Sequence, residues 1–219
     1  MKDELLNDQI KSKDRVTNFG EVNTSNMQVN SMLDLVKQET ERIESRFLEP
    51  ACGDGNFLIE VLDRKSAVLV KNFKINQYDF EKNTIVAIGS IYGVDILEDN
   101  VKSTRDRLFD RFIQVYKGCF KDNLNHDLIK SVKFILEKNI IHGDSLTLKQ
   151  VDSDNPITFS EWSIINNKLK RRDFTLSELL AYSPFEKGTL FSDMGDEVII
   201  PRPVKEYPLI KFDKLYKEC

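Results

Sequence analysis

The chain contains few cysteines, histidines and tryptophans, and it has no long apolar run. Three cysteines (Cys52, Cys119 and Cys219), two histidines and one tryptophan occur in 219 residues. The cysteines are odd in number and widely spaced, which argues against a disulfide framework and for a reducing cytoplasm. No Cys/His cluster has metal-ligand spacing, so no metal site is predicted. No apolar run approaches the ~20 residues that span a bilayer, and the polar N-terminus does not resemble a signal peptide.

Positive charge is not in excess either. Lys and Arg number 32 against 36 Asp and Glu, which gives a net charge of −4. This excludes a chain built throughout to coat nucleic acid, although one basic face would suffice to bind DNA. The densest basic segment is Lys168-Leu169-Lys170-Arg171-Arg172. Lys168, Lys170, Arg171 and Arg172 are therefore candidates for a DNA contact, and the alternative is a solvated hairpin.

What the sequence does contain is an alternation of apolar runs and helical stripes. The length suits one α/β domain with a full core, preceded by a polar N-terminal arm at residues 1–16. Helical spacing predicts helices at 27–43, 57–71, 98–116 and 122–138, whereas 77–81 is expected to be a connecting loop and 85–91 fits helix or strand. Apolar runs predict strands at 47–48, 91–96 and 139–144. This order indicates a mostly parallel sheet covered on both faces.

A different pattern begins after Ser145. Residues 157–164 alternate as a strand does, Asn166-Asn167 is a turn signal, and 168–174 returns as a second strand. A short helix at 176–182 and a proline-containing tail with an edge strand near 197–200 should follow. We expect one domain at 17–219, with a core at 17–146 and a hairpin and tail at 147–219.

The segment from Arg46 to Leu58 carries the most information. It reads as a strand, an acid, a Gly-x-Gly turn (Gly53 and Gly55) and a helix start, which commonly cradles a nucleotide-like cofactor. A dinucleotide fingerprint needs a third glycine where Leu58 stands, so the NAD interpretation fails. Carboxylates at Glu49 and Asp54 would repel a pyrophosphate, and they favour a cofactor with an ammonium and a sulfonium group.

The string E-P-A-C-G-D-G-N-F-L closely resembles the first motif of S-adenosylmethionine-dependent DNA methyltransferases, in particular the adenine-N6 group of restriction–modification systems. The alternative is an ordinary strand–helix turn. The resemblance covers about Thr17 to Leu146. It implies a Rossmann-like class I methyltransferase fold, with helices on both faces of the sheet, and S-adenosyl-L-methionine as cofactor. The cofactor-binding residues that it implies at the turn are Glu49, Pro50, Ala51, Cys52, Gly53, Asp54, Gly55 and Asn56.

Three apolar runs end in an acid, at Glu49, Asp95 and Asp144. Ligands of open α/β sheets bind beyond the carboxyl ends of the strands, where these acids should meet. By resemblance, Asp95 binds the ribose and Asp144 the adenine amino group, with Ile96 and Ser145 adjacent. The segment Gly20–Ser25 resembles the G-E-V-F-T-P segment of the family, in which Thr24 would meet the carboxylate of the cofactor.

The family's acceptor motif, [N/D]-P-P-[Y/F], is absent from the sequence. At the matching distance stand Glu161, which could accept a proton, and Trp162, which could stack on a flipped base. The alternative is a hairpin packed on the core by Phe159 and Trp162. Three functions stay open: a DNA adenine-N6 methyltransferase or its catalytic subunit, with or without a specificity partner; a degenerate subunit that keeps the cofactor and serves in regulation or DNA docking; and an RNA or protein methyltransferase.

Overall fold

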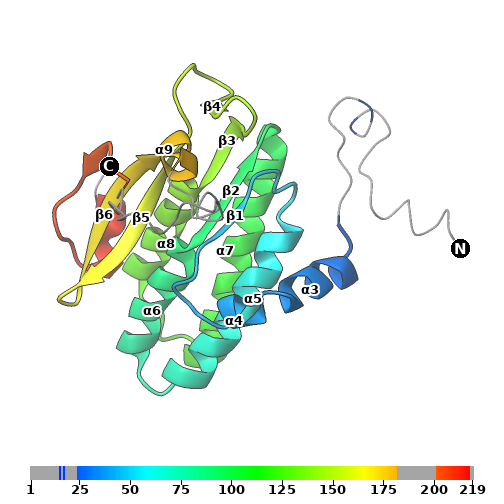
Figure 1. Cartoon of the computed structure of the whole chain (residues 1–219). Helices are drawn as coiled ribbons and strands as arrows, with labels where there is room; N and C mark the ends of the chain where they lie inside the picture. Colours follow the sequence, from blue (N-terminus) through cyan, green and yellow to red (C-terminus); the bar gives the residue numbers. More distant parts are fainter. Residues whose placement is uncertain (1–14, 16, 18–23, 182–200, 218–219) are drawn as a thin grey trace, which may run out of the picture.

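Strands and helices alternate up to residue 144, and antiparallel strands follow. The computed structural model describes residues 15, 17, 24–181 and 201–217 (Figure 1). The first part contains α3 (Asn26–Asp34), α4 (Lys37–Thr40), β1 (Phe47–Glu49), α5 (Asn56–Phe73), α6 (Gln77–Gly89), β2 (Ile91–Asp95), α7 (Glu98–Phe120), α8 (His126–Asn139) and β3 (Ile140–Asp144). The second part contains β4 (Lys149–Gln150), β5 (Thr158–Ile165), β6 (Lys168–Thr175), α9 (Leu176–Ala181), β7 (Lys205–Glu206) and the 3-10 helix η2 (Phe212–Lys217). The predicted strand at 197–200 and the predicted arm, except Arg15, lie outside the described residues.

The main sheet has the order β1-β2-β3-β4. β1 and β3 both pair in parallel with β2, and β4 is antiparallel to β3. Each parallel connection runs through two helices, which gives the chain the length that such a crossover requires. β5, β6 and β7 form a separate antiparallel sheet. The chain is therefore a mixed α/β protein with a mostly parallel sheet, and the predicted C-terminal hairpin is confirmed.

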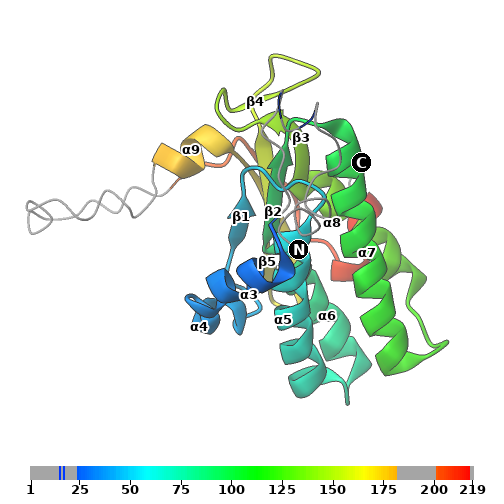
Figure 2. The same ribbon diagram turned by 90° about the vertical axis from the view of Figure 1, so that its right-hand side faces the viewer.

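Different elements cover the two faces of the main sheet. A Cβ on Gly93 would lie 2.9 Å from Leu58 Cδ1 of α5, so Gly93 marks the face packed by helices. Tyr92 and Val94 point to the opposite face, where they cluster with Phe159 of β5. Figure 2 shows α7 and α9 on opposite sides of the strands. The expectation of helices on both faces is thus only partly met, because β5 together with α9 covers the second face.

Helix α5 joins the core to the segment before β1. Its apolar stripe of Leu58, Val61, Leu62 and Leu69 is buried, and each such side chain stabilises the fold by about 1.5–3 kcal/mol. Lys65 lies within the stripe and is completely buried. Its Nζ donates to the backbone oxygens of residues 42, 43 and 45 and to the Ser90 hydroxyl, at 2.6–3.2 Å. These bonds fix the loop that leads into β1.

Residues 77–81 form the start of α6 and not the predicted loop. In the segment 85–91, residues 85–89 complete this helix and Ile91 begins β2. Asn76 caps the helix with its side chain. Glu81 is buried, and it accepts hydrogen bonds from the Tyr116 hydroxyl and from Asn125 Nδ2. Asn125 also caps α8, which therefore begins at His126, later than predicted. Side chains of α7 and of the α8 cap thus satisfy the hydrogen-bonding groups of a polar stretch whose local sequence pattern resembled a loop.

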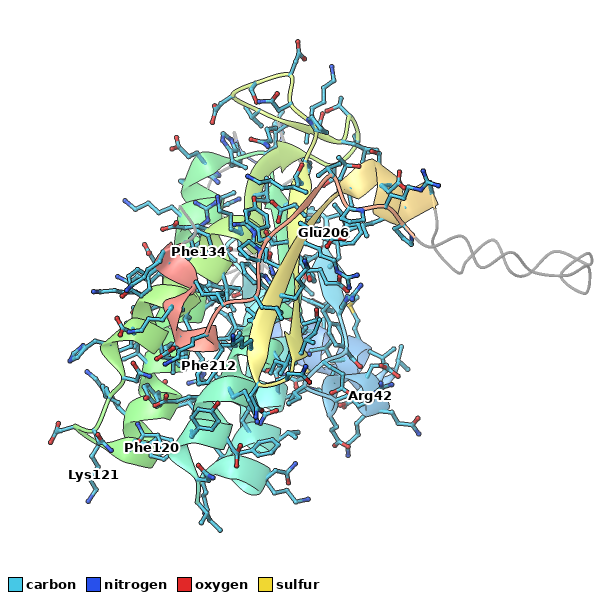
Figure 3. The ribbon with its side chains drawn as sticks, turned by 90° about the vertical axis from the view of Figure 1, so that its left-hand side faces the viewer. Arg42, Phe120, Lys121, Phe134, Glu206 and Phe212 are labelled. Carbon is cyan, nitrogen blue, oxygen red and sulfur yellow. The ribbon has the colours of Figure 1, made fainter. Side chains whose placement is uncertain are left out.

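The C-terminal segment returns to the helical layer. η2 packs against α8, and Figure 3 shows Phe212 and Phe134 on that side of the molecule. The Leu215 N–H donates to Ser131 Oγ at 3.1 Å, and Tyr216 donates to Asp127 at 2.6 Å. None of the helices in the described ranges is long and apolar enough to cross a membrane.

Candidate functional site

The Gly-x-Gly turn has the conformation that its glycines allow. Gly53 and Gly55 have φ values of 54° and 91°, and Gly55 is the N-cap of α5. Because glycine has no side chain to cap the helix, the first N–H groups of α5 are left for another acceptor. A Cβ on Gly55 would lie 2.9 Å from Thr104 Oγ1, and Thr104 also donates to the Gly53 carbonyl at 2.9 Å. Helix α7 therefore presses directly on the turn.

Register places the three strand-end acids on one face of the sheet. Glu49 pairs with Gly93, two residues before Asp95, and Asp95 pairs with His142, two residues before Asp144. Partners in register share a face, and every second residue returns to it. Glu49, Asp95 and Asp144 therefore project on the side of α5. They lie at the carboxyl edge of the parallel strands, which the sequence predicts, whereas the shared face follows from the register.

Asp95 is buried beneath the turn. Its Oδ2 accepts from the Gly53 N–H at 2.8 Å, and its Oδ1 accepts from the Leu97 N–H at 2.9 Å and from Asn100 Nδ2 at 3.2 Å. One oxygen thus has two partners and the other has one. A carboxylate oxygen offers two lone pairs, so Oδ2 retains one for a hydroxyl donor.

At the end of β1, Glu49 is half-buried and Cys52 in the turn beyond it is buried. Burial raises the pKa of the Glu49 carboxyl above its ordinary value, and a hydrogen bond from the Ala51 backbone opposes this. Burial, followed by the charge of Asp95, raises the pKa of Cys52 to about 12, so this side chain stays a thiol at neutral pH. Its backbone N–H bonds to the Val94 carbonyl at 2.9 Å. Buried Cys52 therefore anchors the turn to β2 through this hydrogen bond.

The raised pKa of Glu49 predicts a pH-dependent site. If the ionised carboxyl binds a cationic ligand, that binding weakens as pH drops through the raised pKa, at a pH above that of an ordinary glutamate. Glu49→Gln should weaken binding at neutral pH by about tenfold and remove this dependence. The same change should raise the melting temperature at pH 7, because ionised Glu49 costs the fold stability. Calorimetry and thermal melts from pH 5 to 8 test both, with exposed Glu41→Gln as control.

Asp144 lies beside an open groove. Its Oδ1 accepts from the Leu146 N–H at 2.9 Å and its Oδ2 from Thr147 Oγ1 at 3.0 Å. These bonds, the Leu146 one foremost, lower the pKa of Asp144 and keep it anionic at neutral pH. The groove has a volume of about 820 Å³, and Ile96 and Val151 expose apolar surface there. The predicted residues Ile96 and Asp144 thus line one concavity.

A hydrogen bond connects the loops after β1 and β3. Ser145 Oγ donates to the Pro50 carbonyl at 2.5 Å, so the glycine turn and the Asp144 loop lie together across the end of β2. Ala51 beside it is exposed. Thr24 is also exposed, one residue before the Ser25 that caps α3, and the described residues show no hydrogen bond from it to the turn. Its predicted role stays a prediction.

Asp54 has a cationic partner. Arg107 of α7 pairs with its carboxylate at 3.0 Å, and also donates to the Asp54 carbonyl at 2.5 Å and to Asn56 Oδ1 at 2.9 Å. The charge of Asp54 is therefore partly neutralised. Within the residues that the structure describes, Glu49, unlike Asp54, forms no ion pair.

Trp162 and Glu161 are engaged in the fold. Trp162 is 7% exposed and packs edge-to-face on Phe134, with ring centroids 6.1 Å apart. Its Nε1 donates to Asn139 Oδ1 at 3.4 Å. Glu161 forms ion pairs with Arg46 and Arg172. The hairpin packed on the core is the reading that these contacts support, and in this conformation Trp162 cannot stack on a base.

The basic segment does not form one cationic face. Arg171 is buried, and it donates twice to Asp173, at 2.9 Å each, and to Ser160. Lys170 pairs with Glu206 at 2.9 Å, and Arg172 pairs with Glu161. Lys168 is exposed. Alternation along β6 puts Arg171 on the opposite face from Lys168, Lys170 and Arg172. Arg171 is therefore buried in this conformation, and a DNA contact by the other three stays a prediction.

Sequence reasoning missed the contribution of α7. Asn100, Thr104 and Arg107 contact Asp95, Gly53 and Asp54, respectively. They occur at positions i, i+4 and i+7, which lie on one helical face. A polar stripe at this spacing, directly after a strand-end acid, was the signal in the sequence.

No model of a protein family, no curated protein and no solved structure matches this chain. Within the residues that the structure describes, no group of three or more His, Cys, Asp or Glu side chains could hold a metal ion.

Proposed function

We propose that the edge formed by the glycine turn and the loops after β2 and β3 binds S-adenosyl-L-methionine, and that the chain is the cofactor-binding unit of a DNA adenine-N6 methyltransferase. The observation that carries the proposal is the register. It brings Glu49, Asp95 and Asp144 to one face of the sheet at its carboxyl edge, beside a turn with two positive-φ glycines.

The chemistry of these groups fits the three parts of the cofactor. Asp95 Oδ2 keeps a lone pair for a ribose hydroxyl. Anionic Asp144 would accept from the adenine amino group while Ile96 offers apolar surface to the ring. Glu49 would bind the ammonium of the methionine portion, and the uncapped start of α5 would bind its carboxylate. A bound cofactor supplies a sulfonium methyl group to a nucleophile.

The described residues do not supply an acceptor site for the target base. Glu161 is ion-paired, Trp162 is in the core, and the sequence has no [N/D]-P-P-[Y/F] motif. We therefore propose that methyl transfer needs groups from a partner or specificity subunit, so that this chain alone binds the cofactor without turnover. This combines the first function that the sequence suggests with the second, a binding subunit.

Calorimetric titration of S-adenosylmethionine and S-adenosylhomocysteine tests the cofactor site directly. Micromolar binding to the purified chain is expected. Failure to bind either ligand at millimolar concentration would refute the proposal, because the turn would then be only a strand–helix connection. Incubation of the chain alone with methyl-labelled cofactor and separate DNA, RNA and protein pools should label none of them, and label in DNA would show that no partner is needed for transfer. Label in RNA or protein would favour the third function.

Asp144→Ala should reduce the affinity for S-adenosylhomocysteine about ten- to hundredfold, since it removes an anionic acceptor for the adenine amine. Asp154→Ala is a matched control, because Asp154 lines the same groove but is 98% exposed and pairs with Lys149. Its affinity should stay within twofold of the original. Comparable losses in both variants would contradict a specific role for Asp144.

A further inference from the structure

The cofactor edge receives a contact from the N-terminal region of the chain. Arg15 Nη1 donates to Asp99 Oδ2 at 2.6 Å, and Nη2 donates to Asp99 Oδ1 at 3.2 Å. Nη2 also donates to Asn100 Oδ1 at 3.1 Å. Both acceptors are in the first turn of α7, five residues or fewer after Asp95. The guanidinium of Arg15 thus links the N-terminal region to α7, the helix that directly follows Asp95.

We propose that Arg15 is a positioning residue for the nucleoside site, which acts through Asn100 on the carboxylate of Asp95. The inference rests on the proposed function, since it assigns Asp95 to the ribose. It adds a residue that lies in the predicted N-terminal arm, outside the segment that carries the family resemblance.

The orientation of the Asn100 amide links Arg15 to Asp95. Asn100 is 1% exposed, so its amide is held by protein groups. Arginine has only donors, and it therefore faces the amide oxygen. The amide nitrogen then points away from Arg15, and it donates to Asp95 Oδ1 at 3.2 Å. A flipped amide would set its oxygen against the Asp95 carboxylate and its N–H groups against the donors of Arg15, so Arg15 favours the orientation in which Asn100 supports Asp95.

This orientation of the Asn100 amide determines which oxygen of Asp95 can accept a hydrogen bond from a ligand. Oδ1 accepts from both Asn100 and the Leu97 N–H, which uses its two lone pairs. Among the described residues, Oδ2 accepts from the Gly53 N–H alone. The carboxylate is thereby fixed with Oδ2 available to a ribose hydroxyl. Charge-assisted bonds in such a chain polarise one another, so loss of Arg15 should weaken the carboxylate's hold on the sugar.

The test is a comparison of adenosine with 2′,3′-dideoxyadenosine, each measured by competition against S-adenosylhomocysteine. The original chain should prefer adenosine, since only adenosine offers hydroxyls to Asp95. Arg15→Ala and Asn100→Ala should each reduce this preference about threefold to tenfold, and the double variant should reduce it no further than Asn100→Ala alone. Arg15→Lys should give an intermediate value, because one ammonium cannot contact Asp99 and Asn100 as the planar fork does.

Arg111→Ala is the matched control. Arg111 is also bonded twice to one carboxylate, that of Asp63, at 2.5 and 2.6 Å, and it lies on α7 beyond the site. Its loss should leave the sugar preference unchanged. If Arg15→Ala weakens both nucleosides equally, Arg15 only holds the segment and the inference is wrong. If Arg15→Ala does not fold, Arg15→Lys decides by the same ratio. If the original chain binds neither nucleoside nor S-adenosylhomocysteine, the proposed function is wrong. That outcome differs from failure of the Arg15 inference, in which the original chain binds these ligands and Arg15→Ala leaves the sugar preference unchanged.

Discussion

Replacement of Gly55 by valine is expected to lower the free energy of unfolding by about 2–5 kcal/mol and to abolish the proposed binding of S-adenosylmethionine. Gly55 has φ of 91°, a conformation that a β-branched residue rarely adopts. Its Cβ would lie 2.9 Å from Thr104 Oγ1 and 3.3 Å from the Thr104 Cα. Since Thr104 is completely buried, it cannot move aside without disturbing the packing of α7.

Urea denaturation and calorimetric titration would measure the two effects. Gly118→Ala is the control, because a Cβ there meets nothing within 4 Å and the residue lies in α7. It should raise the unfolding free energy by about 0.5 kcal/mol, in accord with the helix propensities of the two residues. Adding Thr104→Ala to Gly55→Ala should relieve the steric part and leave the backbone strain. A Gly55→Val variant that keeps the original stability and affinity would show that the turn is not constrained as described.

Trp162→Ala should cost about 3–5 kcal/mol, the usual loss for a large aromatic side chain removed from a core. The indole packs on Phe134, donates to Asn139 and lies against the backbone of Gly89, where a Cβ would approach its Cδ1 to 2.8 Å. Trp162→Phe should lose less, since it keeps the contact with Phe134. Ile165→Ala on the same strand is the control, because Ile165 is 44% exposed.

The environment of Trp162 can be measured by fluorescence, because it is the only tryptophan in the chain. Its fluorescence should be blue-shifted, poorly quenched by iodide and unchanged when DNA is added. Strong quenching by DNA, together with a Trp162→Ala variant of nearly unchanged stability, would restore the base-stacking role that the sequence suggested. The two measurements separate a residue of the core from one of an acceptor site.

The prediction of the fold from the sequence succeeded where local pattern and chain order are sufficient. The strands at 91–95 and 140–144, the helix after Gly55 and the hairpin around Asn166-Asn167 follow from apolar periodicity and turn residues. The prediction failed at 77–81, because the polar residues there are satisfied by partners on α7 and α8, more than 30 positions away. Such partners leave no local signal.

The sequence by itself determined which residues stand at the strand ends. Glu49, Asp95 and Asp144 follow apolar runs, and a parallel sheet brings the ends of such runs to one edge. Only the tertiary structure decided what surrounds them. Register put the three acids on one face, whereas α7 supplied Arg107 to Asp54 and Asn100 to Asp95.

The same division holds for charge and aromaticity. The sequence determined that four cations lie within five residues and that one tryptophan precedes them. Their roles depended on the neighbours that folding supplied: Asp173, Glu161 and Glu206 pair with three of the cations, and Phe134 and Asn139 bury the tryptophan. A charge or a ring is available to a ligand only where packing leaves it exposed surface or a free lone pair, and packing joins residues that the sequence keeps apart.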